Sequence, residues 1–197
     1  MQRRVLIRLP EELAGPRVLV RPFRAEDGAA LWAGIDESRA HLAPWLPWVR
    51  TYESEENAHS FCIHSRAKWL LREDMNLGTF ERATGAFLGG CGIHPRDWEV
   101  RAFEIGYWIR RSAEGQGYVA EAVQLLARLA FGALHANRVE IRMDPRNQRS
   151  RNVAARLGFV LEGTLRNAGP DGEGKPSDRH VYALIPAEFQ ALPWAAG

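Results

Sequence analysis

Apolar and polar residues alternate along several short stretches of the chain, most clearly before residue 110. There Phe103, Ile105, Tyr107 and Ile109 alternate with Ala102, Glu104, Gly106 and Trp108. Side chains of a β-strand point to its two faces in turn, so this pattern predicts a strand over residues 101–109. Further strands are expected at residues 18–23 and 138–143, as two strands within 75–93 joined by a glycine turn at 83–85, and as a closing antiparallel pair at 159–165 and 179–185. A glycine-rich loop is expected at 167–175.

Other stretches repeat their apolar residues at helical spacing. The longest runs from Tyr118 to His135, and its apolar face consists of Val119, Val123, Leu126, Ala127, Ala130 and Leu134. Shorter helices are predicted at 26–36, at 150–157, and from a capped start at Ser54 that places Ala58, Phe61, Cys62, Ser65 and Trp69 on one face. Pro44 and Pro47 exclude a regular helix throughout 41–49. The resulting order, β-α-α-β-β-β-α-β-α-β-β, predicts one mixed α/β (α+β) domain over residues 1–197.

Length and composition fit this one-domain interpretation. With 197 residues, 46% apolar and 25% charged, the chain can bury a sizeable core. The net charge of +2 is too small to argue for a nucleic-acid partner, and no apolar run is long enough to predict a membrane span. The start, Met1-Gln2-Arg3-Arg4, is basic, but Pro10-Glu11-Glu12 interrupts the apolar core that a signal peptide needs. We therefore expect a cytoplasmic protein.

The cysteines and histidines give little sign of redox or metal chemistry. Cys62 and Cys91 lie in different predicted elements, and two reduced thiols are favoured over a disulfide. The histidines show no spacing that is typical of metal ligands, so no metal is expected.

The strongest sign of chemistry is the segment Gly115-Gln116-Gly117-Tyr118-Val119-Ala120-Glu121-Ala122, which lies between a predicted strand and the long helix. Glycines at such a turn let the backbone approach a ligand, and the free N–H groups at a helix start favour an anion. A phosphate cradle is one interpretation, and an ordinary glycine turn is another. A dinucleotide-binding fingerprint is disfavoured, because the preceding strand carries Glu104 and too few residues follow Asp144 to complete a doubly wound sheet.

A second block begins with Asn147-Gln148-Arg149-Ser150 and continues through Val153 to Arg156-Leu157-Gly158-Phe159. Together the two blocks resemble the GCN5-related N-acetyltransferase family. The resemblance implies a mostly antiparallel central sheet that is flanked by helices and splayed between its fourth and fifth strands. It also divides the chain into a cofactor half at 101–165 and a substrate-side half at 18–95 plus 166–190.

The resemblance implies that the anion is the pyrophosphate of acetyl-CoA, held by backbone N–H groups at the helix start. Asn147 is the position whose side chain would hydrogen-bond the pantetheine arm. Ser112 stands where the family usually has Gln or Arg, but Arg110 and Arg111 lie just upstream and could supply positive charge. The full set of implied cofactor contacts is Trp108, Ile109, Arg110, Arg111, Gly115, Gln116, Gly117, Tyr118, Val119, Ala120, Asn147, Asn152 and Arg156.

Two residues match catalytic positions of the family. Glu104 matches a glutamate of the fourth strand that often serves as general base, and the N–H group near Ile109 would polarise the acetyl carbonyl. Ala154 occupies the position of the tyrosine acid of many relatives, which leaves Ser150 as the candidate acid. A solvated strand carboxylate for Glu104 and a helix N-cap or first-turn hydroxyl for Ser150 are the structural alternatives.

The N-terminal half resembles the branch that acetylates N-terminal serine and alanine of ribosomal proteins, chiefly over residues 35–48. The resemblance implies an acceptor site bordered by Trp45, Trp48 and Tyr107, although two tryptophans packed on the core are an equal alternative. An α-amine, with a pKa of about 7.7–8.0 against about 10.4 for lysine, needs only a weak base.

The favoured acceptor is therefore a protein N-terminal α-amine, with a ribosomal protein as one candidate. Three alternatives stay open: a small amine such as an antibiotic, polyamine or amino acid; a non-catalytic acyl-CoA-binding protein; and, for the assembly, a homodimer.

Overall fold

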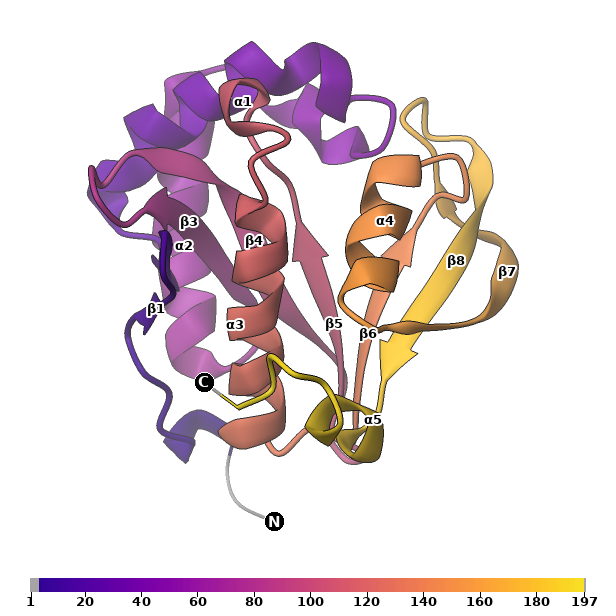
Figure 1. Cartoon of the computed structure of the whole chain (residues 1–197). Coiled ribbons are helices and arrows are strands. Elements are labelled where there is room, and N and C mark those ends of the chain that lie inside the picture. Colours follow the sequence, from indigo (N-terminus) through magenta and orange to yellow (C-terminus); the bar gives the residue numbers. More distant parts are fainter. Residues whose placement is uncertain (1–3, 197) are drawn as a thin grey trace.

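The computed structural model describes residues 4–196 and contains one eight-stranded sheet with helices on both faces (Figure 1). The strands are β1 (Leu13–Ala14), β2 (Val18–Pro22), β3 (Met75–Glu81), β4 (Phe87–Asp97), β5 (Ala102–Tyr107), β6 (Arg138–Met143), β7 (Val160–Pro170) and β8 (Pro176–Leu184). Their order is β1-β2-β3-β4-β5-β6-β8-β7, and only the β5–β6 pair is parallel among the described residues. The expected mixed, mostly antiparallel sheet is confirmed. Residues 1–3 and 197 of the expected 1–197 domain, and with them most of the basic start, lie outside the described residues.

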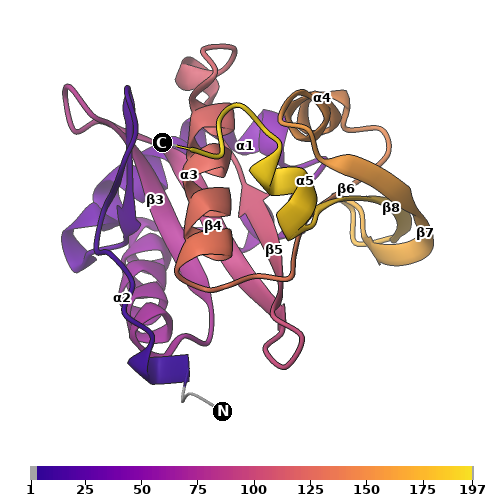
Figure 2. The same ribbon diagram turned by 60° about the horizontal axis from the view of Figure 1, so that its bottom comes forward.

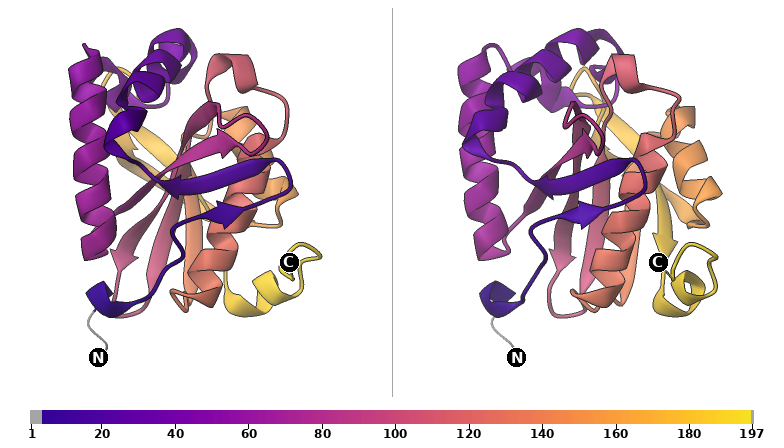
Figure 3. Two further views of the ribbon diagram at one scale, coloured as in Figure 1. Left: turned by 90° about the vertical axis from the view of Figure 1, so that its left-hand side faces the viewer. Right: turned by 60° about the vertical axis from the view of Figure 1, so that its left-hand side comes forward.

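The helices form a layer on each face of the sheet. They are α1 (Gly28–Leu42), α2 (Glu55–Leu71), α3 (Tyr118–Gly132), α4 (Gln148–Arg156) and α5 (Pro186–Gln190), with short 3-10 turns η1 (Arg4–Leu6), η2 (Ala25–Asp27), η3 (Pro47–Thr51) and η4 (Arg111–Ala113). Figure 3 shows α1 and α2 on one side of the sheet and α3 on the other. The short α5 lies beside α3 (Figure 2). Phe131 of α3 and Phe189 of α5 stack there, with ring centroids 4.4 Å apart.

The predicted apolar face of the long helix is confirmed by burial. Val123, Leu126, Ala127, Ala130 and Leu134 are all 0% exposed, and Val119 is partly buried against the same cluster. Burying one leucine side chain contributes about 1.5–3 kcal/mol, so this face holds α3 firmly against the sheet. A second apolar layer, which includes Leu31 and Ile35 of α1, fills the opposite side.

The sheet opens between β5 and β6, as expected for the fourth and fifth strands of the predicted order. The two strands pair only from Ala102 to Glu104 on β5 and from Arg138 to Glu140 on β6. Beyond Glu104 they diverge, so the end of β5 has a hydrogen-bonded neighbour on its β4 side alone. This opening determines where a ligand can reach the middle of the sheet.

The first helix differs from its predicted bounds of 26–36. Residues 25–27 form the 3-10 turn η2, because the Asp27 carboxylate accepts the Arg24 N–H at 2.7 Å and fixes that turn. The helix then continues to Leu42, which is 5% exposed. It ends before Pro44, and η3 follows, so the exclusion of a regular helix throughout 41–49 is confirmed.

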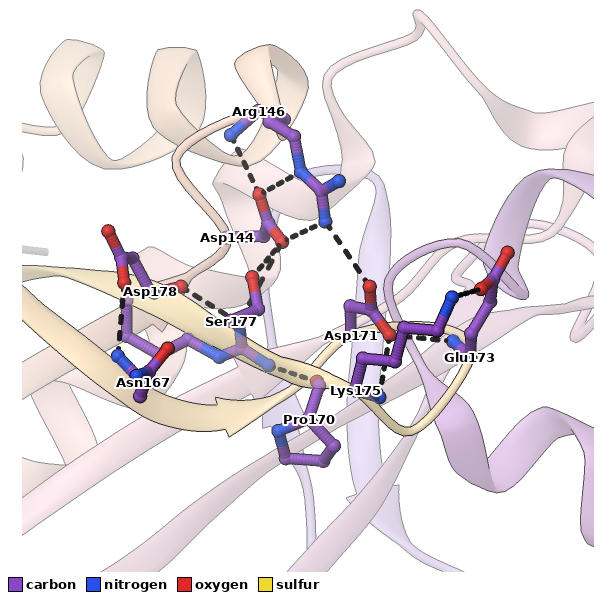
Figure 4. Close-up of polar contacts among 10 residues, drawn as sticks. Asp144, Arg146, Asn167, Pro170, Asp171, Glu173, Lys175, Ser177 and Asp178 are labelled. Carbon is purple, nitrogen blue, oxygen red and sulfur yellow. Dashed lines mark hydrogen bonds and ion pairs between the residues drawn. The ribbon is translucent and has the colours of Figure 1, made fainter.

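The closing hairpin is longer than predicted, and the glycine-rich loop shrinks from 167–175 to 171–175. A bulge between Leu165 and Gly169 lets β7 absorb the glycine, and the Asn167 N–H is held by Asp178 at 3.0 Å. At the base of the loop, Asp144 accepts hydrogen bonds from Arg146 and Ser177 (Figure 4). The short β1 and α5 were not predicted, because two and five residues are too few to show a period.

Three further properties bear on the functional classes considered above. Within residues 4–196, no helix is long and apolar enough to cross a membrane. Over the same range, no group of three or more His, Cys, Asp or Glu side chains could hold a metal ion. Cys62 and Cys91 are free and buried, and burial raises the pKa of each thiol to about 12.

Candidate active site

The connection between β5 and α3 leaves an open surface at the start of α3. Gly115 and Gly117 have φ angles of +75° and +82°, which favour glycine. A Cβ atom on Gly115 would meet no other atom within 4 Å, so the space in front of the turn is free. Gly117 is the N-cap of α3, and the first N–H groups of a helix have no intrahelical partner. This geometry fits a phosphate-containing ligand.

A cavity of about 460 Å³ separates this turn from α4. Gly115, Gly117, Tyr118, Val119 and Ala120 line one side, and Arg149, Asn152, Val153 and Arg156 line the other. Arg149 also forms an ion pair with Glu114, which joins the two sides. The two sequence blocks therefore meet at one cavity, and α4 adds positive charge to it.

A second cavity, of about 410 Å³, occupies the opening between β5 and β6. On one side it is lined by β5 and the residues after it, from Glu104 to Ile109. On the other side lie Met143, Asn147, Ser150 and Val153. Because Ile109 and Val153 line the first cavity as well, the two are continuous from the glycine turn to the middle of the sheet.

The backbone of Ile109 turns its polar groups toward this second cavity. The N–H groups of Trp108 and Arg110 donate to Gly90 O and Leu88 O of β4, each at 2.8 Å. Since successive residues of a strand point their N–H groups to opposite sides, the Ile109 N–H points away from β4. Its carbonyl oxygen lies 3.2 Å from His41 Nε2, on the wall of the cavity. A donor is thus available where the strands diverge.

Asn147, Ser150 and Tyr107 form a connected group on the far side of the opening. Asn147 is the N-cap of α4, and its Oδ1 accepts the Ser150 N–H at 3.1 Å. The Tyr107 hydroxyl lies 2.9 Å from Ser150 Oγ and 3.2 Å from Ser150 O. Burial raises the pKa of Tyr107 to about 12, so its hydroxyl keeps its proton at neutral pH. Asn147 therefore caps α4, and the Ser150 hydroxyl lies in the first turn of that helix and faces Tyr107.

Glu104 is the last residue of β5 that pairs with β6, at the point where these two strands begin to diverge. Its side chain is 23% exposed, and Arg96 and Arg142 lie 3.6 and 3.9 Å from its carboxylate. Burial raises the pKa of Glu104, and this outweighs the opposite effect of His94 and the two arginines. The carboxylate is therefore a stronger base than an exposed glutamate.

A third cavity, of about 580 Å³, lies on the α1 and α2 side of β5. Its walls include Trp48 of η3, Phe61 of α2 and Trp108. It shares Glu104, Gly106, Tyr107 and Trp108 with the second cavity. Glu104 is thus reached from both sides of β5, which allows two different molecules to meet beside one carboxylate.

The sequence model of the acetyltransferase (GNAT) domain family matches residues 17–160, well over half of the chain. The chain belongs to the GNAT acetyltransferase family. Its relatives include the uncharacterized N-acetyltransferase p20 of Bacillus licheniformis, 33% identical over 183 residues, which cover 91% of this chain and 98% of the relative. The ribosomal-protein-serine acetyltransferase of Escherichia coli (strain K12) is 31% identical over 151 residues, 70% of this chain and 76% of the relative.

Solved structures agree with this assignment. Mycobacterium smegmatis RimJ, determined in complex with CoA-disulfide, superposes with a TM-score of 0.80 at 27% identity and covers 92% of this chain and 90% of that one. The predicted resemblance to the ribosomal-protein acetyltransferase branch is confirmed by these relatives. By family, the chain is an acyl-CoA-dependent N-acetyltransferase.

Within this GNAT fold, several of the predicted cofactor residues use their side chains elsewhere. Arg110 donates to Glu37 of α1 at 3.0 Å, and Arg111 pairs with Glu114 at 2.9 Å. The Trp108 indole packs against Trp48, with ring centroids 6.0 Å apart, on the side of the third cavity. The Tyr118 hydroxyl bonds Glu81 and the Gln116 carbonyl accepts from Arg17, so these two residues offer mainly their N–H groups. The two tryptophans predicted for the acceptor site also separate: Trp45 lines the second cavity and Trp48 the third.

His94 lines the third cavity beside Glu104, and the sequence pattern did not single it out. Its Nδ1 lies 2.6 Å from Asp74 Oδ1, and it is paired across β4 and β5 with Glu104. A Cβ atom on Gly92 or Gly106 would come within 3.1 or 3.0 Å of His94 Nε2, so glycine at both positions leaves room for the imidazole. In the sequence, the only indication of this arrangement was the pair of glycines, Gly92 and Gly106, which lie two positions before His94 and two after Glu104. The pairing with Asp74 is not visible in the sequence.

Proposed function

We propose that this GNAT enzyme acetylates the α-amine of a polypeptide N-terminus, with acetyl-CoA as the acetyl donor. The observation that carries the proposal is Glu104, a half-buried carboxylate of raised pKa at the junction of the second and third cavities. A protein acceptor is supported by two relatives, a ribosomal-protein-serine acetyltransferase and a (ribosomal protein uS5)-alanine N-acetyltransferase. A ribosomal protein as acceptor would place the reaction in the cytoplasm.

The cofactor half, residues 101–165, supplies the groups that would hold acetyl-CoA. The glycine turn offers its N–H groups to the pyrophosphate, with Asn152 and Arg156 on the facing helix. Asn147, at the continuous cavity, is placed to meet the pantetheine arm. When bound there, acetyl-CoA supplies an activated acetyl group. The substrate-side half, residues 18–95 and 166–190, surrounds the acceptor.

Three groups of the chain then have defined roles. Glu104 accepts a proton from the acceptor amine, and its raised pKa narrows the gap to the pKa of an α-ammonium, about 7.7–8.0. The Ile109 N–H donates a hydrogen bond to the acetyl carbonyl oxygen, where negative charge develops. Ser150 donates a proton to the leaving sulfur and takes up the proton that the attacking nitrogen releases as the amide forms. The Tyr107 hydroxyl, 2.9 Å from Ser150 Oγ, holds the serine in place.

Mass-detected acetylation with a mixed panel of amines tests the proposal. The panel contains ribosomal-protein N-terminal peptides, polyamines, amino acids and aminoglycosides, each with acetyl-CoA. We expect an acetyl group on a peptide α-amine and strongly reduced turnover in the Glu104→Gln variant, which should still bind CoA. Acetylation of small amines alone would overturn the protein acceptor. CoA binding without turnover of any amine would overturn the enzymatic role.

A further inference from the structure

The third cavity differs in chemistry from the other two. It is walled largely by aromatic and aliphatic side chains, among them Phe23, Trp48, Tyr52, Phe61, Leu77 and Trp108. A cavity of about 580 Å³ with mostly apolar walls and few polar groups is typical of a site for one small ligand or side chain. Its place beside Glu104 and Tyr107 connects it directly to the proposed site of transfer.

The aromatic wall is built by contacts between its own members. Phe23 and Phe61 meet edge to face with ring centroids 5.6 Å apart, and Phe61 meets Tyr52 at 6.0 Å. Tyr52 in turn contacts Trp48 at 5.5 Å, and Trp48 contacts Trp108 at 6.0 Å. These residues come from four separate segments of the chain, so the wall is fixed by tertiary packing. A preformed aromatic wall loses little entropy when an apolar group binds to it.

The charge of the cavity suits one ammonium group and no more. Among residues 4–196, Glu104 is the one carboxylate that lines it, beside the polar side chains of Thr51, Asn76 and His94. Asp74 hydrogen-bonds His94 and does not line the cavity. A polyamine or an aminoglycoside carries several ammonium groups, and all but one would lose water here without a partner.

We propose that the acceptor carries its amine beside a bulky apolar group, so that a polypeptide acceptor begins with an aromatic or large aliphatic residue whose side chain occupies this cavity. The inference rests on the proposed α-amine acetylation and names the kind of N-terminus. It distinguishes this chain from an enzyme for N-terminal serine, whose small polar side chain would leave the aromatic wall uncovered. The amine lies toward Glu104, and the side chain extends toward Trp48 and Phe61.

Two measurements test the assignment. The first compares kcat/KM for tetrapeptides that differ only in the first residue, Phe, Leu, Ser or Asp, together with spermidine. We expect Phe and Leu to exceed Ser by about tenfold or more, because filling an apolar pocket discriminates on that scale. An equal or higher value for Ser, or a preference for spermidine, would overturn the inference while α-amine acetylation of the peptides would still support the proposed function.

The second measurement does not depend on turnover. Isothermal titration of the CoA-loaded protein with phenylalanine amide and with serine amide compares the affinity of the cavity for the two side chains. Tighter binding of phenylalanine amide is expected. Equal binding would contradict the assignment, even if no peptide in the first experiment were acetylated.

Variants of the aromatic wall test whether the third cavity causes the preference for a first-residue Phe over Ser. Trp48→Ala should lower kcat/KM for the Phe peptide about tenfold and leave the Ser peptide nearly unchanged. Trp32→Ala is the matched control, because Trp32 packs against the same apolar layer but does not line the cavity. If thermal unfolding shows that Trp48→Ala is not folded, Tyr52→Leu tests the same wall. A Phe-to-Ser ratio that neither Trp48→Ala nor Tyr52→Leu changes would refute the placement.

Discussion

The proposed chemistry of the site depends on the pKa of one carboxylate, that of Glu104. Glu104 is the last residue of β5 that pairs with β6, and burial raises its pKa. Arg96, Arg142 and His94 oppose that effect, and Glu140 reinforces it. A general base must be ionised to accept a proton, so kcat/KM should fall as the pH drops through the raised pKa of Glu104.

Replacing Glu104 by Gln should lower kcat about 10²–10⁴-fold, the usual range for loss of a positioned base. The amide keeps the size of the side chain, so the affinity for CoA, measured by calorimetry, should not change. Full activity in the Gln variant would show that Glu104 is a solvated strand carboxylate, the alternative that the sequence left open.

His94 provides a separate test of the same carboxylate. Its charge lowers the pKa of Glu104, so His94→Gln should raise that pKa and move the acidic limb of the pH profile of kcat/KM to higher pH. The exposed His64 of α2 serves as control, because His64→Gln removes a histidine outside the site. An acidic limb that does not move in His94→Gln would mean that the imidazole does not act on Glu104.

At the scale of elements, an ion pair holds the end of β5 against α1. Arg110 donates to Glu37, and this bond lowers the pKa of Glu37 to about 2. A group with a depressed folded pKa stabilises the protein above its unfolded pKa of about 4.3, and the contribution disappears as the pH falls toward the folded value.

Glu37→Gln should therefore lower the melting temperature by about 2–4 °C near neutral pH, which corresponds to about 1 kcal/mol for a partly exposed pair. Thermal unfolding followed from about pH 7 toward about pH 3 should show the difference between the two proteins shrinking. A difference that stays constant with pH would assign the effect to packing of the side chain and exclude its charge as the cause.

The turn before α3 can be tested with a matched pair of glycines. Gly115 and Gly85 both have φ of +75°, and a Cβ atom on either would meet nothing within 4 Å. Alanine at each position should cost a similar stability, about 1–2 kcal/mol of backbone strain. Only Gly115→Ala should weaken CoA binding, by about tenfold, because its methyl group enters the proposed phosphate cradle. Equal CoA affinities of the two variants would argue against the cradle.

At the scale of the whole molecule, periodicity predicted most of the sheet and its core. The alternation on β5 placed Glu104, Gly106 and Trp108 on one face, and all three line the third cavity. Trp108 was predicted from the sequence among the cofactor contacts, whereas its indole packs against Trp48 on the side of the third cavity. The apolar face of α3 was predicted residue by residue, because local spacing determines it.

The parts that could not be predicted depend on contacts between distant segments. Tyr107 meets Ser150 across 43 residues, and His94 meets Asp74 across 20. The aromatic wall joins four segments, and no local pattern shows that Trp45 and Trp48 face different cavities. Tertiary packing determines these placements, so the resemblance supplied the residues but not their partners.

The most direct test of the account is the position of the acetyl group on a single peptide that begins with Phe and carries one internal lysine. Incubation with acetyl-CoA, followed by fragment-ion mass spectrometry, distinguishes the α-amine from the lysine ε-amine. We predict acetylation at the α-amine by the wild-type protein and a much slower reaction in Glu104→Gln. Acetylation at the lysine, or an α-acetyl group formed equally fast by Glu104→Gln, would contradict it.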